Sequence, residues 1–93
     1  MTFQQLSFVM EVAKRKSFNK AAEHLYTNQS NVSNIIKQLE DELGIQIFQR
    51  TKKGVSITEE GQEFLSYADD IMRKKEFVED VYSARNRYQR QHL

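Results

Sequence analysis

Neutral hydrogen-bonding side chains gather at the start of one predicted helix, in the stretch NQSNVSN. Helical spacing places most of them on a single face, because residues three and four apart are neighbours. Amides and hydroxyls both donate and accept hydrogen bonds, and the major groove of DNA presents both donors and acceptors. A face that only kept a helix soluble would more usually carry Lys and Glu, although capping and solvation remain the alternative interpretation. The candidate base-contacting residues on this face are Gln29, Ser30, Ser33 and Asn34, with Lys37 one turn further along.

A second group of polar and basic residues could contact the DNA backbone. Near a predicted hairpin tip the candidates are Arg50, Thr51, Lys52 and Lys53. Ser17 and Asn19 stand at the start of a short predicted helix, where free backbone N–H groups favour phosphate binding. A basic pair in a turn is by itself typical of a soluble loop. The hairpin residues therefore indicate DNA binding only in combination with the polar helix face.

No residue pattern indicates catalysis or metal binding. The absence of cysteine excludes disulfides and thiolate sites and is compatible with the reducing cytoplasm. The two histidines, His24 and His92, are far apart in sequence, and the acidic clusters have no partner base. We therefore expect a cytoplasmic protein that is not an enzyme and binds no cofactor or metal. No apolar run approaches the roughly 20 residues of a membrane span.

Charge alone decides little about the partner. The 93 residues have the length of one small domain, and the net charge is only +1. Residues 1–58 carry 8 Lys and Arg against 5 Asp and Glu, whereas residues 59–93 carry 6 against 8. The front of the chain is therefore mildly basic and the back mildly acidic, without the strongly basic character of many DNA-binding domains.

Three helices are predicted to position the polar face. A capping box of Thr2 and Gln5 opens the first, Ser17 caps a short second helix, and Asn28 caps a third that ends at Gly44. The expected inward residues are Phe3, Leu6, Phe8, Val9, Met10, Val12 and Ala13, then Phe18, Ala21, Ala22 and Leu25, then Val32, Ile35, Ile36, Leu39 and Leu43. The acidic run at residues 40–42 is interpreted as a solvated face.

A β-hairpin is predicted after the third helix. Ile45 and Ile47 alternate with a polar residue, and Val55 and Ile57 do the same. Residues 51–54 between these two runs end in a glycine, which is typical of a hairpin turn.

A long helix is predicted from residue 59 to about residue 90. Thr58 is its N-cap, acidic residues follow in the first turn, and the chain has no proline to interrupt it. At 1.5 Å per residue it would span roughly 48 Å, more than the preceding residues need. Its apolar stripe therefore calls for a second helix to pack against it. The stripe comprises Phe64, Leu65, Ala68, Ile71, Met72, Val78 and Tyr82.

This order of elements predicts a mainly α fold. Residues 1–58 form a winged helix-turn-helix of three helices and a hairpin, and residues 59–93 form a dimerising linker helix. In such motifs the second helix of the pair enters the major groove with its N-terminal residues. Residues 28–43 are thus the expected recognition helix, and residues 50–54 the expected wing.

The stretches SFNKAAEHL and NQSNVSNIIKQLEDELGIQIFQRTKKGVSITEEG resemble the N-terminal domain of LysR-type transcriptional regulators. The family pattern has a Ser-Phe helix start with an inner Ala-Ala and Leu, then Q-P-A-L-S, L-E-x-x-L-G, L-F-x-R-T and V-x-L-T-x-x-G. The matching residues are Ser17, Phe18, Ala21, Ala22, Leu25, Gln29, Ser33, Leu39, Glu40, Leu43, Gly44, Phe48, Arg50, Thr51, Val55, Thr58 and Gly61. The resemblance covers residues 3 to about 90.

The resemblance implies a bacterial regulator that binds interrupted inverted repeats in double-stranded DNA. Two linker helices would pair antiparallel in a homodimer and present two recognition helices to successive major grooves. A separate C-terminal domain would bind a small-molecule effector and drive tetramer formation. That domain is not among these residues, so the chain is expected to be a DNA-binding fragment.

The polar face departs from the family pattern at two positions. Ser30 stands where the family often has proline, and Asn34 stands where it often has arginine. Because asparagine matches the N6 and N7 groups of adenine, base recognition is predicted to lean towards A·T steps. The alternative function is a winged helix that dimerises or docks another protein without contacting DNA, since a fold does not fix a function.

Overall fold

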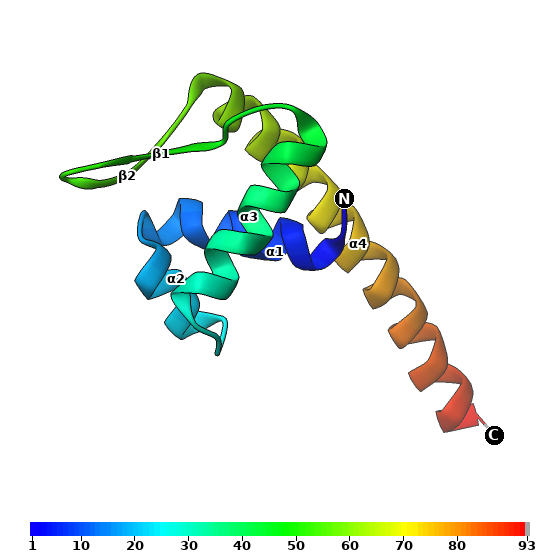
Figure 1. The fold of residues 1–93 in the computed structure, drawn as a ribbon. Coiled ribbons are helices and arrows are strands. Elements are labelled where there is room, and N and C mark those ends of the chain that lie inside the picture. Colours follow the sequence, from blue (N-terminus) through cyan, green and yellow to red (C-terminus); the bar gives the residue numbers. More distant parts are fainter. Residues whose placement is uncertain (93) are drawn as a thin grey trace.

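The structure is a computed structural model that describes residues 1–92, with the side-chain surroundings of residues 1–85 (Figure 1). The side chain of His92 lies outside the described residues, so the prediction that it belongs to no catalytic or metal site is not tested. In chain order the elements are α1 (Phe3–Arg15), α2 (Phe18–His24), α3 (Gln29–Leu43), β1 (Phe48–Thr51), β2 (Gly54–Ile57) and α4 (Glu59–His92). This order confirms the predicted mainly α fold with a hairpin wing.

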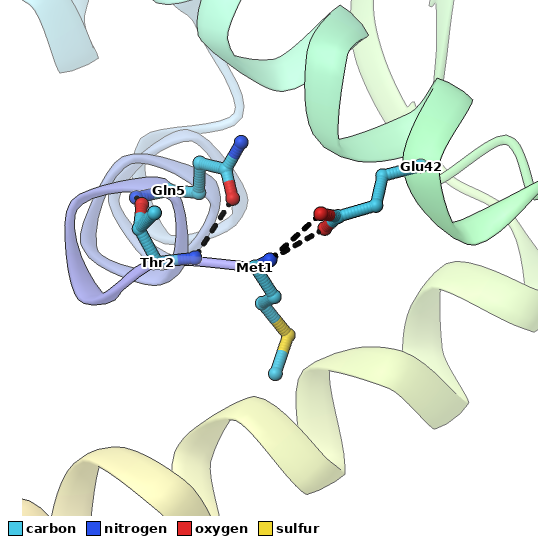
Figure 2. Close-up of polar contacts among 4 residues, drawn as sticks. All are labelled: Met1, Thr2, Gln5 and Glu42. Atoms are coloured by element: carbon cyan, nitrogen blue, oxygen red, sulfur yellow. Dashed lines mark hydrogen bonds and ion pairs between the residues drawn. The ribbon is translucent and has the colours of Figure 1, made fainter.

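Each helix of the body begins at the cap that the sequence predicts. The backbone N–H of Gln5 donates to Thr2 Oγ1 at 3.0 Å, and the N–H of Thr2 donates to Gln5 Oε1 at 2.8 Å (Figure 2). Ser17 caps α2, and Asn28 Oδ1 accepts from the N–H of Asn31 at 2.8 Å. These local bonds satisfy backbone donors that a helix leaves free at its N-terminus, so they set where each helix starts.

The hydrophobic core lies where α1, α2 and α3 meet and is closed by the segment before the wing. Its buried residues are Phe8, Val9, Val12, Phe18, Ala21, Ala22, Val32, Ile36, Leu39, Ile47 and Phe48. The prediction that Phe3 turns inward was wrong, because its side chain is 52% exposed. Its ring lies 5.3 Å from the ammonium of Lys75 on α4, outside the core.

The wing is shorter than predicted. β1 and β2 pair antiparallel with Phe48 opposite Ile57 and Thr51 opposite Gly54. The first run was expected to include Ile45 and Ile47, but the strand begins only at Phe48. Ile47 is 0% exposed, so the alternation around it reflects burial in the core and not pairing in a sheet.

α4 begins in direct contact with the backbone that precedes the wing. Thr58 Oγ1 accepts from the N–H of Gly61 at 2.9 Å, and the Thr58 hydroxyl reaches the carbonyl oxygens of Gln46 and Ile47. A Cβ added at Gly61 would lie 2.3 Å from the Ile47 carbonyl oxygen. Only glycine allows this approach, so Gly61 sets how closely α4 packs on the body.

Beyond this contact α4 runs past α1 and leaves the body, on the side opposite the wing (Figure 1). The described chain is correspondingly elongated, with extents of 59 × 25 × 20 Å. Phe64 and Leu65 pack against the core of their own protomer, and Ala68 is 0% exposed. The assignment of Ala68 to a dimer seam was therefore wrong, because it has no surface left for a partner.

Candidate nucleic-acid interface

The N-terminal half of α3 presents a polar face to solvent. Val32 is 0% exposed and is the one residue of NQSNVSN that is buried, as the sequence predicts. Ser33 is half-buried beside the wing. The exposed members of the face are Gln29, Ser30, Asn34 and Lys37. Several neutral donors and acceptors are therefore available on one surface of this helix.

Asn31 adds to this face a residue that sequence reasoning missed. Its side chain is exposed, and its Nδ2 donates to Thr27 Oγ1 at 2.9 Å across the turn before α3. This bond ties the first turn of α3 to the preceding loop. Asn31 stands three residues before Asn34, so helical spacing could have placed it beside this face.

Arg50 lies on β1, separated from the turn residues by Thr51, and its side chain reaches back to the body and does not point out from the tip. Its guanidinium carbon is 4.1 Å from the centroid of the Phe18 ring, and its Nη2 donates to Ser33 Oγ at 2.6 Å. The Phe18 ring in turn meets Phe48 edge to face, with centroids 6.1 Å apart. Three elements therefore converge on this arginine: α2, α3 and β1.

The tip of the wing carries two outward lysines. Lys52 and Lys53 form the turn between the strands, and both are exposed. Thr51 Oγ1 donates to the carbonyl of Gly54 at 3.1 Å and accepts from the N–H of Lys53 at 3.3 Å, which closes the turn. Gly54 has a φ of 124°, in the region that favours glycine. The turn thus holds two ammonium groups away from the body.

An open groove separates α3 from β1. On one side it is lined by Ser33, Asn34, Lys37, Phe48 and Arg50, and towards its other end by Glu40, Asp41 and Glu60. The end beside the polar face is thus cationic and the far end is acidic. This charge division marks out the part of the groove that an anionic chain would occupy.

The start of α2 offers fewer candidate contacts to DNA than α3 and the wing. The Ser17 hydroxyl accepts from the N–H of Lys20 at 3.1 Å, so its oxygen already caps the helix. Asn19 is exposed. A phosphate here would therefore meet the Asn19 side chain and the remaining backbone N–H groups.

The prediction that the acidic run at residues 40–42 is a solvated face was wrong for Glu40. Its Oε2 accepts from the backbone N–H of Ile47 at 2.7 Å and of Phe48 at 3.3 Å. The carboxylate thereby fixes the segment that leads into β1. At the same end of α3, Glu42 Oε2 lies 2.7 Å from the terminal ammonium of Met1 (Figure 2). Asp41 between these two acidic residues is exposed.

The described residues give no support for a metal site or a membrane-spanning helix. No group of three or more His, Cys, Asp or Glu side chains there is arranged to hold a metal ion. His24 is a surface residue, with its Nδ1 3.2 Å from Nη2 of Arg15. None of the described helices is long and apolar enough to cross a membrane.

Comparison with known proteins identifies the family. A family model described as a bacterial regulatory helix-turn-helix protein, lysR family, matches residues 3–62. The chain belongs to the LysR family. It is 42% identical over 82 residues to the HTH-type transcriptional regulator CzcR of Bacillus subtilis, covering 88% of this chain and 28% of CzcR. It is 39% identical over 72 residues to the HTH-type transcriptional regulator HdfR of Escherichia coli, covering 77% of this chain and 26% of HdfR.

Solved structures of LysR-family DNA-binding domains share the fold. The BenM domain in complex with benA site 1 DNA matches with a TM-score of 0.85 and 32% identity, over 89% of this chain and 93% of that one. The CbnR domain in a DNA complex matches with a TM-score of 0.85 and 28% identity, over 90% and 97%. These matches confirm the predicted family and winged helix-turn-helix fold.

The curated relatives are considerably longer than this LysR-family chain, which spans about a quarter of the length of those it matches. They are named as transcriptional regulators, in agreement with the expectation that the chain is not an enzyme.

Replacement of Glu40 by alanine should destabilise the domain by about 1–3 kcal/mol, because two backbone N–H groups near the core lose their acceptor. Glu40→Gln should cost less, since the amide oxygen can still accept. The neighbouring variant Asp41→Ala is the control and should be nearly neutral. Urea unfolding of the three variants measures the differences, and equal stability of Glu40→Ala and Asp41→Ala would contradict the assigned role.

Proposed function

We propose that this LysR-family chain binds double-stranded DNA in a sequence-specific manner, as the recognition module of a bacterial transcriptional regulator. The observation that carries the proposal is the exposed neutral polar face of α3, which lies across one groove from a cationic wing. In a winged helix-turn-helix this helix is the element that enters the major groove. The BenM and CbnR domains, which share the fold, form complexes with DNA, and this supports DNA as the partner of the chain.

In this proposal base edges are contacted from the first two turns of α3. The contacting residues are Gln29, Ser30, Ser33 and Asn34. Their short neutral side chains keep the helix close to the base pairs, and amides can bond to a base through two atoms at once. Each good contact of this kind contributes about 1–3 kcal/mol to discrimination against a wrong base. Asn34 matches adenine, so A·T pairs are the proposed preference at its position.

The DNA backbone is proposed to lie along the cationic end of the groove. The residues assigned to it are Ser17, Asn19, Lys37, Arg50, Thr51, Lys52 and Lys53. Glu40, Asp41 and Glu60 at the far end of the groove repel phosphates, which confines the DNA to the N-terminal half of α3 and the wing. The net charge of the chain is small, but in this proposal its cations lie next to the phosphates of the bound DNA.

A homodimer through α4 is the proposed assembly. On the described part of this helix the exposed large apolar side chains are Tyr67, Phe77, Val78 and Tyr82, at 44–60% exposure. Val78 also lines a shallow depression with Ile71 and with Phe3 of α1. Exposed apolar surface on a helix that leaves its own domain favours pairing with another helix. Phe64, Leu65 and Met72 lie closer to the body and would contribute at the edge of this seam.

The remaining expectations are parts of the same proposal. A division into a DNA-binding unit over residues 1–58 and a linker helix over residues 59–93 agrees with the departure of α4 from the body. A cytoplasmic location follows from bacterial DNA as the partner. Tetramer assembly and effector binding stay predictions about a C-terminal domain in a longer regulator.

The second candidate function is a protein-docking module, which the exposed apolar side chains of α4 favour. It differs from the first in the surface used, because docking through α4 leaves the polar face of α3 without a role. The two proposals therefore predict different responses to salt and to changes in α3.

Binding to a duplex selected from a random-sequence pool tests DNA recognition. The logarithm of the affinity should fall linearly with the logarithm of the salt concentration, and Lys52→Ala should reduce that slope by about 1. Gln29→Ala should lose about 1–3 kcal/mol on the selected duplex and little on an unrelated one. Arg73→Ala removes a cation from α4 and should leave both measurements unchanged. A salt-insensitive affinity would favour the docking module.

The dimer proposal is tested at Val78. Its replacement by aspartate places an uncompensated charge in the seam, so Val78→Asp should shift the protein from dimer to monomer in sedimentation velocity. Ala84→Asp adds the same charge to an exposed position that helical spacing places away from the stripe, and it should remain dimeric. If Val78→Asp is as dimeric as Ala84→Asp, the seam lies on another face of α4.

A further inference from the structure

We infer that Lys16 and Lys20, on either side of the turn between α1 and α2, bind phosphates of the DNA backbone beside the wing. This inference rests on the proposed DNA-binding function. It adds two cations to a region to which only the neutral residues Ser17 and Asn19 were assigned. Phosphate contacts carry no sequence information directly, so these two lysines raise the affinity for DNA of any sequence.

The α1–α2 turn lies against the wing at the cationic end of the groove. A Cβ added at Gly54, next to the lysines of the wing turn, would lie 3.6 Å from the backbone oxygen of Lys16. This is an ordinary van der Waals distance, so the two turns are in contact. Phe18, two residues after Lys16, lines the groove together with Ser33 and Arg50. A DNA backbone bound by the wing turn therefore lies within reach of the long, flexible lysine side chains of the α1–α2 turn.

Lys16 ends α1 in a backbone conformation that favours glycine. Its φ of 53° lies in the left-handed region, where glycine or asparagine usually ends a helix because a Cβ is hindered there. The charge of Lys16 does oppose the α1 dipole, but Lys14 and Arg15 already supply cations in the last turn. The side chain is exposed, and within residues 1–85 it forms no ion pair. The fold itself therefore does not require a lysine at this position.

Lys20 also stands where the fold does not favour a cation. It lies in the first turn of α2, at the positive end of the helix dipole, where carboxylates are preferred. That turn has no acidic residue, and Glu23 in the next turn forms no ion pair with Lys20. Departures from local preference are expected where function determines the residue. Two lysines that the fold does not need thus flank one turn of the surface proposed to bind DNA.

Four exposed ammonium groups then stand on two adjoining turns. Residues 52–53 supply two of them, and Lys16 and Lys20 supply the others. The one carboxylate of α1, on Glu11, is already paired with Arg15 at 2.8 Å. Clustered like charges repel one another in the free chain, so an anion is the favoured occupant of this surface. An ammonium is also a common phosphate ligand, acting as a point charge.

The test compares Lys16→Gly and Lys20→Gln with Arg73→Gln, which removes an exposed cation from α4. Affinity is measured across a salt series for the selected duplex and for an unrelated one. Each lysine variant should reduce the slope of log affinity against log salt by about 0.9 per bound protomer, the value for one phosphate contact. At about 0.15 M salt the affinity should fall roughly 3- to 10-fold, by the same factor for both duplexes. Arg73→Gln should change neither quantity.

Urea unfolding of the same variants separates a role in binding from a role in folding. Glycine suits the backbone conformation at residue 16, and a neutral side chain suits the first turn of α2. Neither lysine variant should therefore have an unfolding midpoint below that of the wild type. The expected result is weaker DNA binding without a loss of stability.

A salt slope equal to that of Arg73→Gln in both lysine variants, or an affinity loss confined to the selected duplex, would overturn the inference while wild-type DNA binding stands. Unfolding midpoints lowered in both variants would assign the lysines to the fold and would overturn it as well. A wild-type affinity that does not depend on salt would overturn the proposed function and this inference with it.

Discussion

The backbone of Ile47 joins the three elements on which recognition depends. Its N–H donates to the Glu40 carboxylate of α3 at 2.7 Å, and its carbonyl accepts from the backbone N–H of Thr58 at 2.9 Å. Its side chain is 0% exposed in the core, and Gly61 approaches its carbonyl so closely that a Cβ would clash. α3, the wing and α4 therefore meet at one residue, whose backbone N–H and carbonyl are both hydrogen-bonded.

This junction explains how a small domain can hold a polar helix face, a wing and a protruding helix in fixed relation. The start of β1 follows Ile47 directly, so the carboxylate of Glu40 fixes where the wing leaves the body. Arg50 then links the wing back to α3 and α2 through Ser33 and Phe18. A partner that binds the groove would meet a surface already organised by these bonds, with little ordering cost.

Local signals in the sequence predicted the helix starts, the glycine that ends α3 and the apolar faces, because caps and periodicity depend on residues close in the chain. The misassigned residues all depend on distant partners. Glu40 was predicted to be solvated, but its carboxylate accepts from the backbone N–H of Ile47. The side chain of Arg50 was expected to be free for DNA, but it bonds a serine 17 residues away. Ala68 fits the apolar stripe of α4, but burial against the body takes it out of the expected dimer seam. Which atoms touch DNA depends likewise on a partner outside the chain.

The central claim is that the polar face of α3 and the wing form the surface that binds DNA. Its most direct test is to follow the backbone amide signals of the isotope-labelled chain by nuclear magnetic resonance while a selected duplex is added. The account predicts that the largest shifts fall on residues 29–37 and 50–54, with little change along the exposed side of α4. Shifts confined to α4, with the signals of residues 29–37 unmoved, would contradict it.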